Sequence, residues 1–234
     1  MKKPFRFKQF EIYQDQTAMK VGTDGVLLGA WAQLQQGNRI LDIGTGTGLI
    51  ALMLAQRFNE ATVDAVELDD NAYAQAKDNV LNSKFKERIQ VHHSSIQDYS
   101  PTNTFDLIVS NPPFFITNER INFDARKQAR QQETLTFQDL IAKTAKLLSA
   151  NGSASFIIPF DLETYFLEIA SHHNLYPSQI TRVRGNETSD YKRILINLQR
   201  IQKEVVISTL TIELKRHIYT EQYINLTKDF YLKM

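Results

Sequence analysis

In the sequence RILDIGTGTG, at residues 39–48, a mostly apolar run leads directly into three evenly spaced glycines. This order predicts a buried strand followed by a sharp turn, because glycine adopts backbone angles that other residues avoid. The residues that follow, 49–57, have the apolar spacing of a helix. A strand, a glycine turn and a helix in this order are typical of the first unit of a nucleotide-binding α/β sheet.

From residue 38 onward, short β-branched runs alternate with longer helical patterns, which predicts βαβ units and a mostly parallel sheet. We expect strands at 39–43, 62–67, 88–92, 105–110 and 153–158, and helices at 49–57, 71–85, 136–148 and 161–173. We also expect strands in the last third, at 180–184, 194–198 and 205–214. The predicted fold class is α/β and Rossmann-like: a seven-stranded, mostly parallel sheet with an antiparallel C-terminal edge and helices on both faces.

The chain has no internal repeat and no linker rich in proline, glycine or serine. We therefore predict one domain over residues 1–234. Within it, residues 1–37 do not follow the strand-and-helix alternation. They are predicted to form an N-terminal extension packed on a core of residues 38–234.

Composition excludes several classes of protein. With 42% hydrophobic and 23% charged residues, the 234-residue chain is neither disordered nor fibrous. Its longest apolar run, residues 49–55, is far below the roughly 18 residues that span a bilayer. The N-terminus also lacks the apolar stretch of a secretory signal. We expect a cytoplasmic protein with no membrane segment and no obligate protein partner.

The chain contains no cysteine, which excludes disulfides, thiol nucleophiles and thiolate metal sites. The histidine pairs at 92–93 and 172–173 lack a carboxylate at ligand spacing, so we expect no metal site. Any chemistry must therefore use oxygen and nitrogen groups or a cofactor.

The glycine turn is also informative about the ligand. The dinucleotide fingerprint G-x-G-x-x-G would place a small residue at position 49, but Leu49 stands there, which disfavours a dehydrogenase. Glu67 closes the second expected strand, 19 residues after Gly48. A carboxylate at that strand end can accept hydrogen bonds from ribose hydroxyls.

Asp42, placed just before Gly44, Gly46 and Gly48, resembles the first motif of the class I S-adenosylmethionine-dependent methyltransferases. By this resemblance Asp98, in SSIQDY, matches the acidic position that contacts the adenine amine of the cofactor. The alternative is that Asp98 is an ordinary turn residue.

A second motif, Asn111-Pro112-Pro113-Phe114, follows the expected strand at 105–110. Two prolines fix the backbone and remove two amide donors, which leaves carbonyl acceptors. The Asn111 side chain and the Pro112 carbonyl can accept both protons of an exocyclic NH₂ group, while Phe114 stacks on the attached ring. The alternative is a proline-rich turn closed by a buried phenylalanine.

This arrangement favours a particular reaction. An aromatic amine is a poor nucleophile because its lone pair is delocalised into the ring. Two acceptors on its protons push it toward tetrahedral geometry and aim the lone pair at a sulfonium methyl group. The methyl group would then move by direct in-line displacement, a reaction that needs neither a thiol nor a metal.

The motifs LDIGTGTG (41–48), VELDD (66–70) and NPPF (111–114), in this order, resemble the amino-methyltransferases with the motif (N/D/S)PP(Y/F/W). That group modifies adenine, guanine or cytosine amines and, in one branch, a glutamine side-chain amide. The segments at 5–10, 18–31 and 228–232 extend the likeness over essentially the whole chain. In these segments the chain is similar to the tRNA1(Val) (adenine(37)-N6)-methyltransferase family.

This resemblance implies the class I methyltransferase fold, S-adenosyl-L-methionine as cofactor and tRNA as partner, with methylation of the adenine N6 amine. It also implies that KVGTDG (20–25) lies over the cofactor, with Lys20, Thr23 and Asp24 near its methionine end. The alternative is a turn at 22–25 followed by a packed helix.

The net charge of +1 conceals an uneven distribution: acidic residues dominate 59–98, whereas basic residues dominate 1–20 and 180–203. Four basic residues stand just beyond the NPPF motif, where a nucleic-acid backbone would pass: Arg120, Arg126, Lys127 and Arg130. We expect them to contact phosphates. A solvated helix face is the alternative.

Three other functions stay open from the sequence. A protein glutamine N5-methyltransferase would usually have tyrosine at position 114 and a separate helical N-terminal domain. A methyltransferase could also act on an amine of another RNA or DNA base. A non-catalytic binding module is disfavoured by the intact Asp42, Glu67 and NPPF motif.

Overall fold

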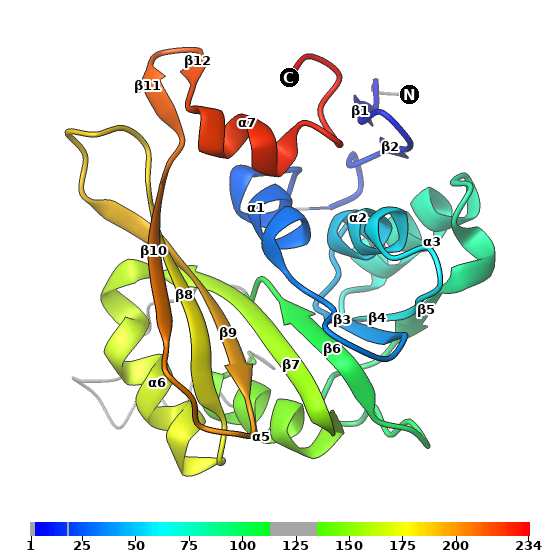
Figure 1. Cartoon of the computed structure of the whole chain (residues 1–234). Coiled ribbons are helices and arrows are strands. Elements are labelled where there is room, and N and C mark those ends of the chain that lie inside the picture. Colours follow the sequence, from blue (N-terminus) through cyan, green and yellow to red (C-terminus); the bar gives the residue numbers. More distant parts are fainter. Residues whose placement is uncertain (1–2, 18, 113–134) are drawn as a thin grey trace, which may run out of the picture.

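In the computed structural model, which describes residues 3–17, 19–112 and 135–234, one large sheet organises the chain (Figure 1). Its strand order is β10-β8-β9-β7-β6-β3-β4-β5. The strands are β3 (Arg39–Ile43), β4 (Thr62–Glu67), β5 (Ile89–His93), β6 (Phe105–Ser110), β7 (Leu148–Pro159), β8 (Tyr176–Arg184), β9 (Tyr191–Gln199) and β10 (Val206–Thr211).

The helices are α1 (Thr23–Trp31), α2 (Leu49–Arg57), α3 (Asp70–Leu81), α5 (Phe137–Leu147), α6 (Glu163–His172) and α7 (Glu221–Thr227). Short elements complete the described chain: β1 (Phe5–Arg6), β2 (Glu11–Ile12), β11 (Glu213–Lys215), β12 (Ile218–Tyr219), and 3₁₀ turns at Lys86–Arg88 and Phe160–Leu162. None of these helices is long and apolar enough to cross a membrane.

The α/β class and the mostly parallel sheet are confirmed, but the details of the C-terminal third differ from the prediction. The sheet has eight strands rather than seven. Its antiparallel strand, β9, lies inside the sheet between β7 and β8, rather than at the edge. The turn at 185–190 returns the chain as a hairpin, which makes β9 antiparallel. The chain then reverses once more and β10 pairs with β8, to which it is therefore parallel.

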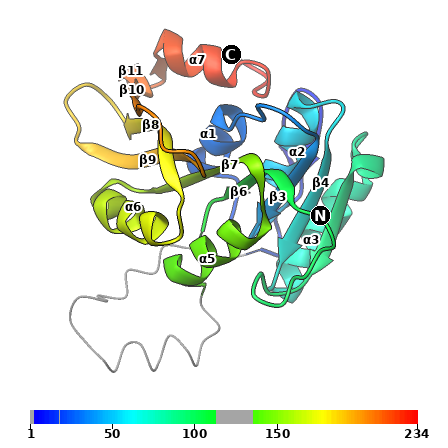
Figure 2. The ribbon, with the colours of Figure 1, turned by 60° about the horizontal axis from the view of Figure 1, so that its bottom comes forward.

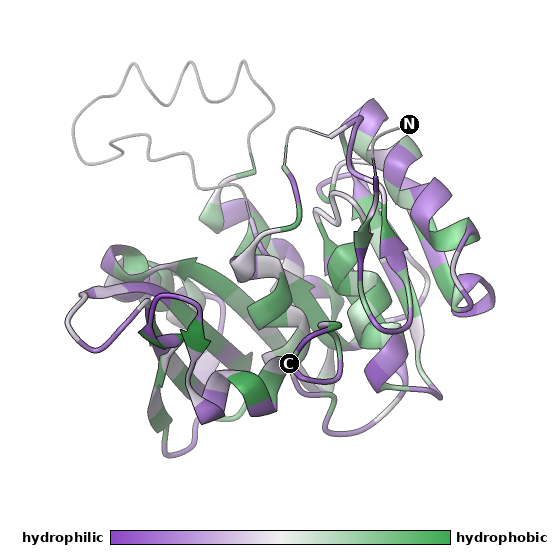
Figure 3. Ribbon diagram, turned by 90° about the horizontal axis from the view of Figure 1, so that it is seen from above, coloured by the Kyte–Doolittle hydropathy of each residue, from purple (hydrophilic) through white to green (hydrophobic). Residues whose placement is uncertain are grey.

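Helices cover both faces of the sheet, as expected (Figure 2). Neighbouring strand residues point to opposite faces, so that Ile40 belongs to the core under α1, α2, α3 and α7, while Leu41 belongs to the core under α5 and α6. Both side chains are fully buried. In Figure 3 hydrophobic residues concentrate in the strands, whereas hydrophilic ones lie on outer helix faces and connecting loops.

Some predicted boundaries are wrong for identifiable reasons. The helix expected to run to residue 85 ends at Leu81, because Ser83 accepts the Phe85 amide and starts a turn. Its start is as expected, since Asp69 caps it by accepting the Ala72 amide. The helix expected to run to 148 ends at Leu147, and β7 starts at once, well before 153. The expected strand at 205–214 is interrupted after Thr211, and residues 213–215 pair with β12 instead.

The N-terminal segment packs beside the C-terminus. Phe7 forms a bridge with Tyr231, and the Lys8 amide donates to the Phe230 carbonyl over 2.8 Å. The two termini therefore lie close together (Figure 1). Helix α1 packs against α2 and α7. The division into an extension of 1–37 and a core of 38–234 remains a prediction.

Candidate active site

The glycine turn between β3 and α2 leaves space on one side. Gly44, Gly46 and Gly48 have φ angles of +70°, +58° and +81°, in the left-handed region that favours glycine. A Cβ atom on Gly44 or Gly46 would meet no described atom within 4 Å, whereas one on Gly48 would meet Ala76 of α3 at 3.6 Å. Among the described residues, the first two glycines therefore border open space, and the third lies in ordinary contact distance of α3, where its left-handed φ rather than its lack of a side chain favours glycine.

Asp42 is fully buried beneath this turn. Its Oδ2 accepts hydrogen bonds from the Thr45 hydroxyl at 2.6 Å and from the Ala51 amide at 3.2 Å, which tie the turn to the start of α2. Its Oδ1 is buried and has no hydrogen-bond partner in the described part of the chain. Burial raises the pKa of Asp42 to about 7, against the lowering effect of these hydrogen bonds. The carboxyl group thus holds the loop and has one buried oxygen without a partner among the described residues.

Glu67 reaches the same turn from the end of β4. Its Oε2 accepts the Gly46 amide at 2.8 Å, and its Oε1 accepts the amides of Leu68 and Asp69 at 2.9 and 3.0 Å. The structure therefore brings together the glycine loop and the acidic residue that the sequence paired with it. Leu68, which the sequence analysis did not single out, is 42% exposed beside this carboxylate. The sequence gives one indication of Leu68: it is an apolar residue between the acidic residues Glu67 and Asp69.

Asn111 lies at the same edge of the sheet, because parallel strands end on one side. The Ser110 hydroxyl donates to the Ile43 carbonyl at 2.8 Å and so ties the end of β6 to the end of β3. The Oδ1 of Asn111 is buried and has no partner among the described residues. A buried acceptor without a donor is costly, so this atom suits a ligand that brings an N–H group.

Several predicted site residues lie outside the part of the chain that the structure describes. Pro112 is described and buried. Beyond it, the undescribed residues are Pro113, Phe114, Arg120, Arg126, Lys127 and Arg130. Their roles stay predictions.

Asp98 is exposed and bonds within its own loop, where its Oδ2 accepts the Ser95 hydroxyl at 2.7 Å. This geometry fits a turn residue and leaves the predicted contact with the cofactor adenine untested.

The three N-terminal residues predicted to bind the cofactor, Lys20, Thr23 and Asp24, differ in their exposure and in their partners. Lys20 and Thr23 are exposed. Asp24 forms an ion pair with Arg193 of β9 at 2.7 Å. A Cβ on the next residue, Gly25, would lie 3.1 Å from Leu49, the first residue of α2. The start of α1 therefore lies beside the helix that the glycine loop opens.

Asn79 of α3 contacts the glycine loop, which the sequence did not predict. Its Nδ2 donates to the Thr47 carbonyl of the glycine loop at 2.9 Å and to the Tyr13 carbonyl at 2.8 Å. Its Oδ1 accepts the Tyr13 amide at 2.9 Å. An asparagine in an amphipathic helix is ordinarily solvated. The sequence could have indicated that Asn79 is buried, because its spacing places it on the same face of the helix as Ala72 and Ala76.

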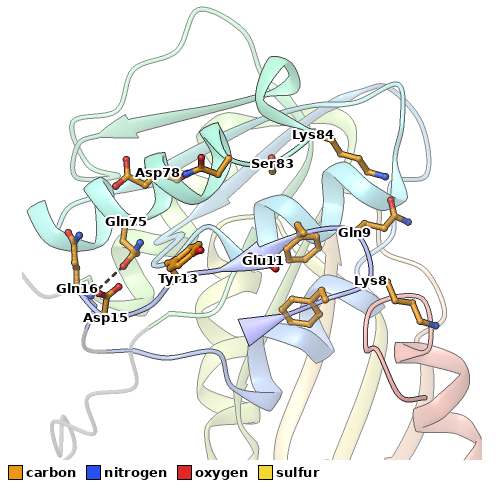
Figure 4. A pocket seen from close by; sticks show the side chains of 13 residues that line it. Lys8, Gln9, Glu11, Tyr13, Asp15, Gln16, Gln75, Asp78, Ser83 and Lys84 are labelled. Carbon is orange, nitrogen blue, oxygen red and sulfur yellow. Dashed lines mark hydrogen bonds between the residues drawn. The ribbon is translucent and has the colours of Figure 1, made fainter. Parts of the chain in front are cut away.

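A groove also runs between the N-terminal segment and α3, away from this edge (Figure 4). None of the predicted site residues that the structure describes lines it. Among the described residues, no three histidine or carboxylate side chains gather in a way that could hold a metal ion. His92 and His93 each face one carboxylate, Asp64 and Asp70 respectively, at 3.1 Å.

Comparison with known proteins agrees with this geometry. Residues 18–167 match the family model for the methyltransferase small domain. The fold is similar to that of a predicted O-methyltransferase from Agrobacterium tumefaciens, with a TM-score of 0.70 and 19% identity over 88% of this chain and 96% of that one. A TehB-like SAM-dependent methyltransferase from Corynebacterium glutamicum has a TM-score of 0.51 and 19% identity over 77% and 89% of the two chains.

The sheet and the loops at its carboxyl edge thus define a class I methyltransferase fold. The proteins named tRNA1(Val) (adenine(37)-N6)-methyltransferase from Christiangramia forsetii and Flavobacterium psychrophilum are 49% and 48% identical to this chain. The alignments cover 99% and 98% of this chain and 98% and 100% of those proteins. The chain belongs to the tRNA1(Val) (adenine(37)-N6)-methyltransferase family.

Proposed function

We propose that the protein transfers a methyl group from S-adenosylmethionine to the N6 amine of adenine in tRNA, with adenine 37 of tRNA1(Val) as the target. The single observation that carries the proposal is the buried, unpartnered Oδ1 of Asn111, at the sheet edge that also holds the glycine loop and Glu67. The near-full-length relatives whose names state this reaction support the choice of base and RNA.

The residues at the glycine loop fit S-adenosylmethionine. Gly44 and Gly46 border open space where a ligand can approach the backbone. A carboxylate has about four acceptor positions, of which Glu67 uses three. A ribose hydroxyl can take the fourth or displace the Gly46 amide. The exposed Leu68 offers apolar surface to an adenine ring. The buried Oδ1 of Asp42, which has no partner in the described part of the chain, would accept a donor that reaches it.

When bound, S-adenosylmethionine supplies an electrophilic methyl group on a sulfonium that departs as a neutral thioether. The residues of the chain then need only orient the acceptor amine. The Oδ1 of Asn111 would accept one N6 proton, and the Pro112 carbonyl the other. Both contacts oppose delocalisation of the lone pair into the purine and direct it toward the methyl group. Phe114 would stack on the base.

The proposal also includes contacts with the cofactor and with RNA that rest on the sequence alone. Lys20, Thr23 and Asp24 would lie near the methionine end of the cofactor, and Asp98 near its adenine amine. Four basic residues would contact phosphates: Arg120, Arg126, Lys127 and Arg130. A base beside the anticodon is single-stranded and can be splayed into a pocket at modest cost. The substrate implies a cytoplasmic protein.

The test is methyl transfer by the purified protein. It would be incubated with S-adenosylmethionine labelled in the methyl group and with total tRNA from a strain that lacks the enzyme. We expect label in the RNA fraction. Label in added protein, with unlabelled RNA, would instead support the glutamine N5-methyltransferase alternative.

A further inference from the structure

The amide side chain of Asn79 joins two segments that are far apart in the sequence. It is 1% exposed, and its two Nδ2 protons go to Thr47 of the glycine loop and to Tyr13. Its oxygen accepts the Tyr13 amide. All three bonds form only when the glycine loop and the N-terminal segment are both in place. An isolated change in either segment leaves a buried polar group unpaired, which is costly.

The segment held by Asn79 continues along α3 as a strap, defined as residues 13–17 and 19–22. The Gln16 amide donates to the side chain of Gln75, which is 2% exposed. Figure 4 shows Tyr13 and Gln16 lying over α3, with Gln75 directed at Gln16. Within the strap, the Val21 amide donates to the Gln14 side chain at 2.7 Å. Two buried amide side chains on one helix therefore fix the course of the strap.

The far end of the strap is anchored on the other side of the glycine loop. It leads into α1, where Asp24 pairs with Arg193, a residue of β9 that lies opposite Pro159 at the end of β7. Glu67 approaches the loop from β4, on the opposite side of β3. The proposed function places the adenine of the cofactor at Leu68 and Asp98, on the β5 side of Glu67. A ligand whose ribose is at Glu67 would therefore extend its methionine half the other way, across the glycine loop toward the end of the strap.

We propose that Asn79 is a positioning residue for the methionine half of the cofactor: it holds the strap in register with the glycine loop so that the two enclose that half. This inference rests on the proposed function, because it takes S-adenosylmethionine as the ligand. It predicts an effect that a purely structural role would not produce. Loss of Asn79 should weaken ligands that carry the amino-acid moiety more than ligands that lack it.

The test compares two ligands by calorimetry: S-adenosylhomocysteine, which has the amino-acid moiety, and 5′-methylthioadenosine, which lacks it. In Asn79→Leu, a change of similar size that removes all three bonds, we expect the affinity for S-adenosylhomocysteine to fall about tenfold or more. The affinity for 5′-methylthioadenosine should fall less than about threefold, because Glu67 still holds the nucleoside half. Thermal unfolding of each variant reports whether it folds.

Two further variants complete the design. Asn82→Ala is the matched control, because exposed Asn82 caps the C-terminal end of the same helix and, in the described part of the chain, its side chain donates to the Asp78 carbonyl of that helix rather than to the strap or the glycine loop. It should leave both affinities unchanged. Gln75→Leu releases the strap without touching the glycine loop, and should weaken S-adenosylhomocysteine selectively but less than Asn79→Leu. It carries the test if Asn79→Leu does not fold.

Equal losses for the two ligands, or no loss, in folded Asn79→Leu and Gln75→Leu proteins would overturn the inference. If the wild-type protein methylates tRNA while these variants bind both ligands normally, only the inference fails. If the wild-type protein binds neither ligand and transfers no methyl group, the proposed function fails as well.

Discussion

Asn111 contributes to the proposed chemistry through one atom, the buried Oδ1 that lacks a donor among the described residues. Replacement by leucine keeps the size of the side chain and removes the acceptor. We expect Asn111→Leu to lower kcat about 10²-fold or more, because a positioned hydrogen-bond partner in a reaction centre has an effect of that order. Asn111→Asp keeps acceptor oxygens and should retain more activity than Asn111→Leu.

Binding of S-adenosylhomocysteine provides the control for these variants. Glu67 and the glycine loop do not depend on the Asn111 side chain for any described hydrogen bond. The dissociation constant should therefore change by less than about threefold in both variants. Normal turnover by Asn111→Leu would contradict the role given to this oxygen.

Asp42 gives a prediction about pH. Burial raises its pKa in the folded protein to about 7, above the unfolded value of 3.8. Between those values the folded state holds a proton that the unfolded state has lost, so this carboxyl group makes the free energy of unfolding fall as pH rises from about 4 to 7. Asp42→Asn removes this titration. The melting temperature of Asp42→Asn minus that of the wild-type protein should therefore be larger at pH 8 than at pH 5.

Thermal unfolding at several pH values measures this difference. Asp98→Asn, which changes an exposed carboxylate in a loop, is the control. A difference between Asp42→Asn and wild type that stays constant from pH 5 to pH 8 would show that Asp42 does not titrate in this range.

At the scale of single residues, the sequence identified which side chains meet but not how they are bonded. Asp42 and Glu67 were both predicted to bind the cofactor, and the structure places both at the glycine loop. That Asp42 also ties Thr45 to α2 could not be read from the sequence, because an aspartate before a glycine turn suits either use. Asn79 was missed because its partners are 32 and 66 positions away.

At the scale of elements, the glycine loop depends on backbone angles that only glycine adopts at low cost. Gly46 has φ of +58° and faces open space. Gly46→Val would put a branched side chain into that space and strain the backbone by about 1–2 kcal/mol. We expect the affinity for S-adenosylhomocysteine to fall more than about tenfold, while the protein remains folded at 25 °C.

Gly185→Ala, at the turn between β8 and β9, is the matched control. Among the described atoms, a Cβ there would meet the Ser189 hydroxyl alone, at 3.6 Å, an ordinary contact. It should leave affinity unchanged. A Gly46→Val protein that binds S-adenosylhomocysteine as tightly as wild type would refute the close approach of ligand and backbone.

The strands that border the site were predictable because their ends are marked locally. The bounds of β3, β4 and β6 agree with the expected 39–43, 62–67 and 105–110. β7 was harder to place. It begins immediately after α5, and its pairing with β6 shifts register between Phe105 and Leu107. The chain approaches closely there: a Cβ on Gly152 would lie 2.9 Å from the Phe105 carbonyl. Such crowding depends on tertiary contacts rather than on local pattern.

At the scale of the whole molecule, the position of β9 between β7 and β8 could not be predicted from the sequence. The strands themselves were recognisable from the sequence. Which strand each of them pairs with depends on contacts between distant parts of the chain, because several strand edges can accept the same partner. The N-terminal segment illustrates the same limit. Its course over α3 is set by the side chains of Asn79 and Gln75, and no periodicity within the segment itself reports them.

Charge is also a property of the whole chain. The net charge of +1 gives no sign of RNA binding, but the basic residues are concentrated in particular segments. Replacement of the four basic residues beyond NPPF by glutamine (Arg120, Arg126, Lys127 and Arg130) should weaken tRNA binding and flatten its salt dependence. Each lost phosphate contact lowers the slope of log K against log salt by about 0.7–0.9. Affinity for S-adenosylhomocysteine should not change.

Exposed lysines of the acidic segment provide the comparison: Lys77, Lys84 and Lys86. Their replacement by glutamine should alter tRNA binding much less. Binding measured from 50 to 200 mM salt separates the two sets. Equal effects of both sets would show that the residues beyond NPPF have no particular role in holding RNA.

Mapping the methylated nucleoside tests directly whether the protein methylates the adenine N6 amine. Unmodified tRNA1(Val) would be incubated with S-adenosylmethionine and either the wild-type protein or Asn111→Leu, then digested and sequenced by mass spectrometry. The proposal predicts N6-methyladenosine at position 37 with the wild-type protein and almost none with Asn111→Leu. Absence of methylated adenosine with the wild-type protein, or a methyl group on another base or atom, would contradict it.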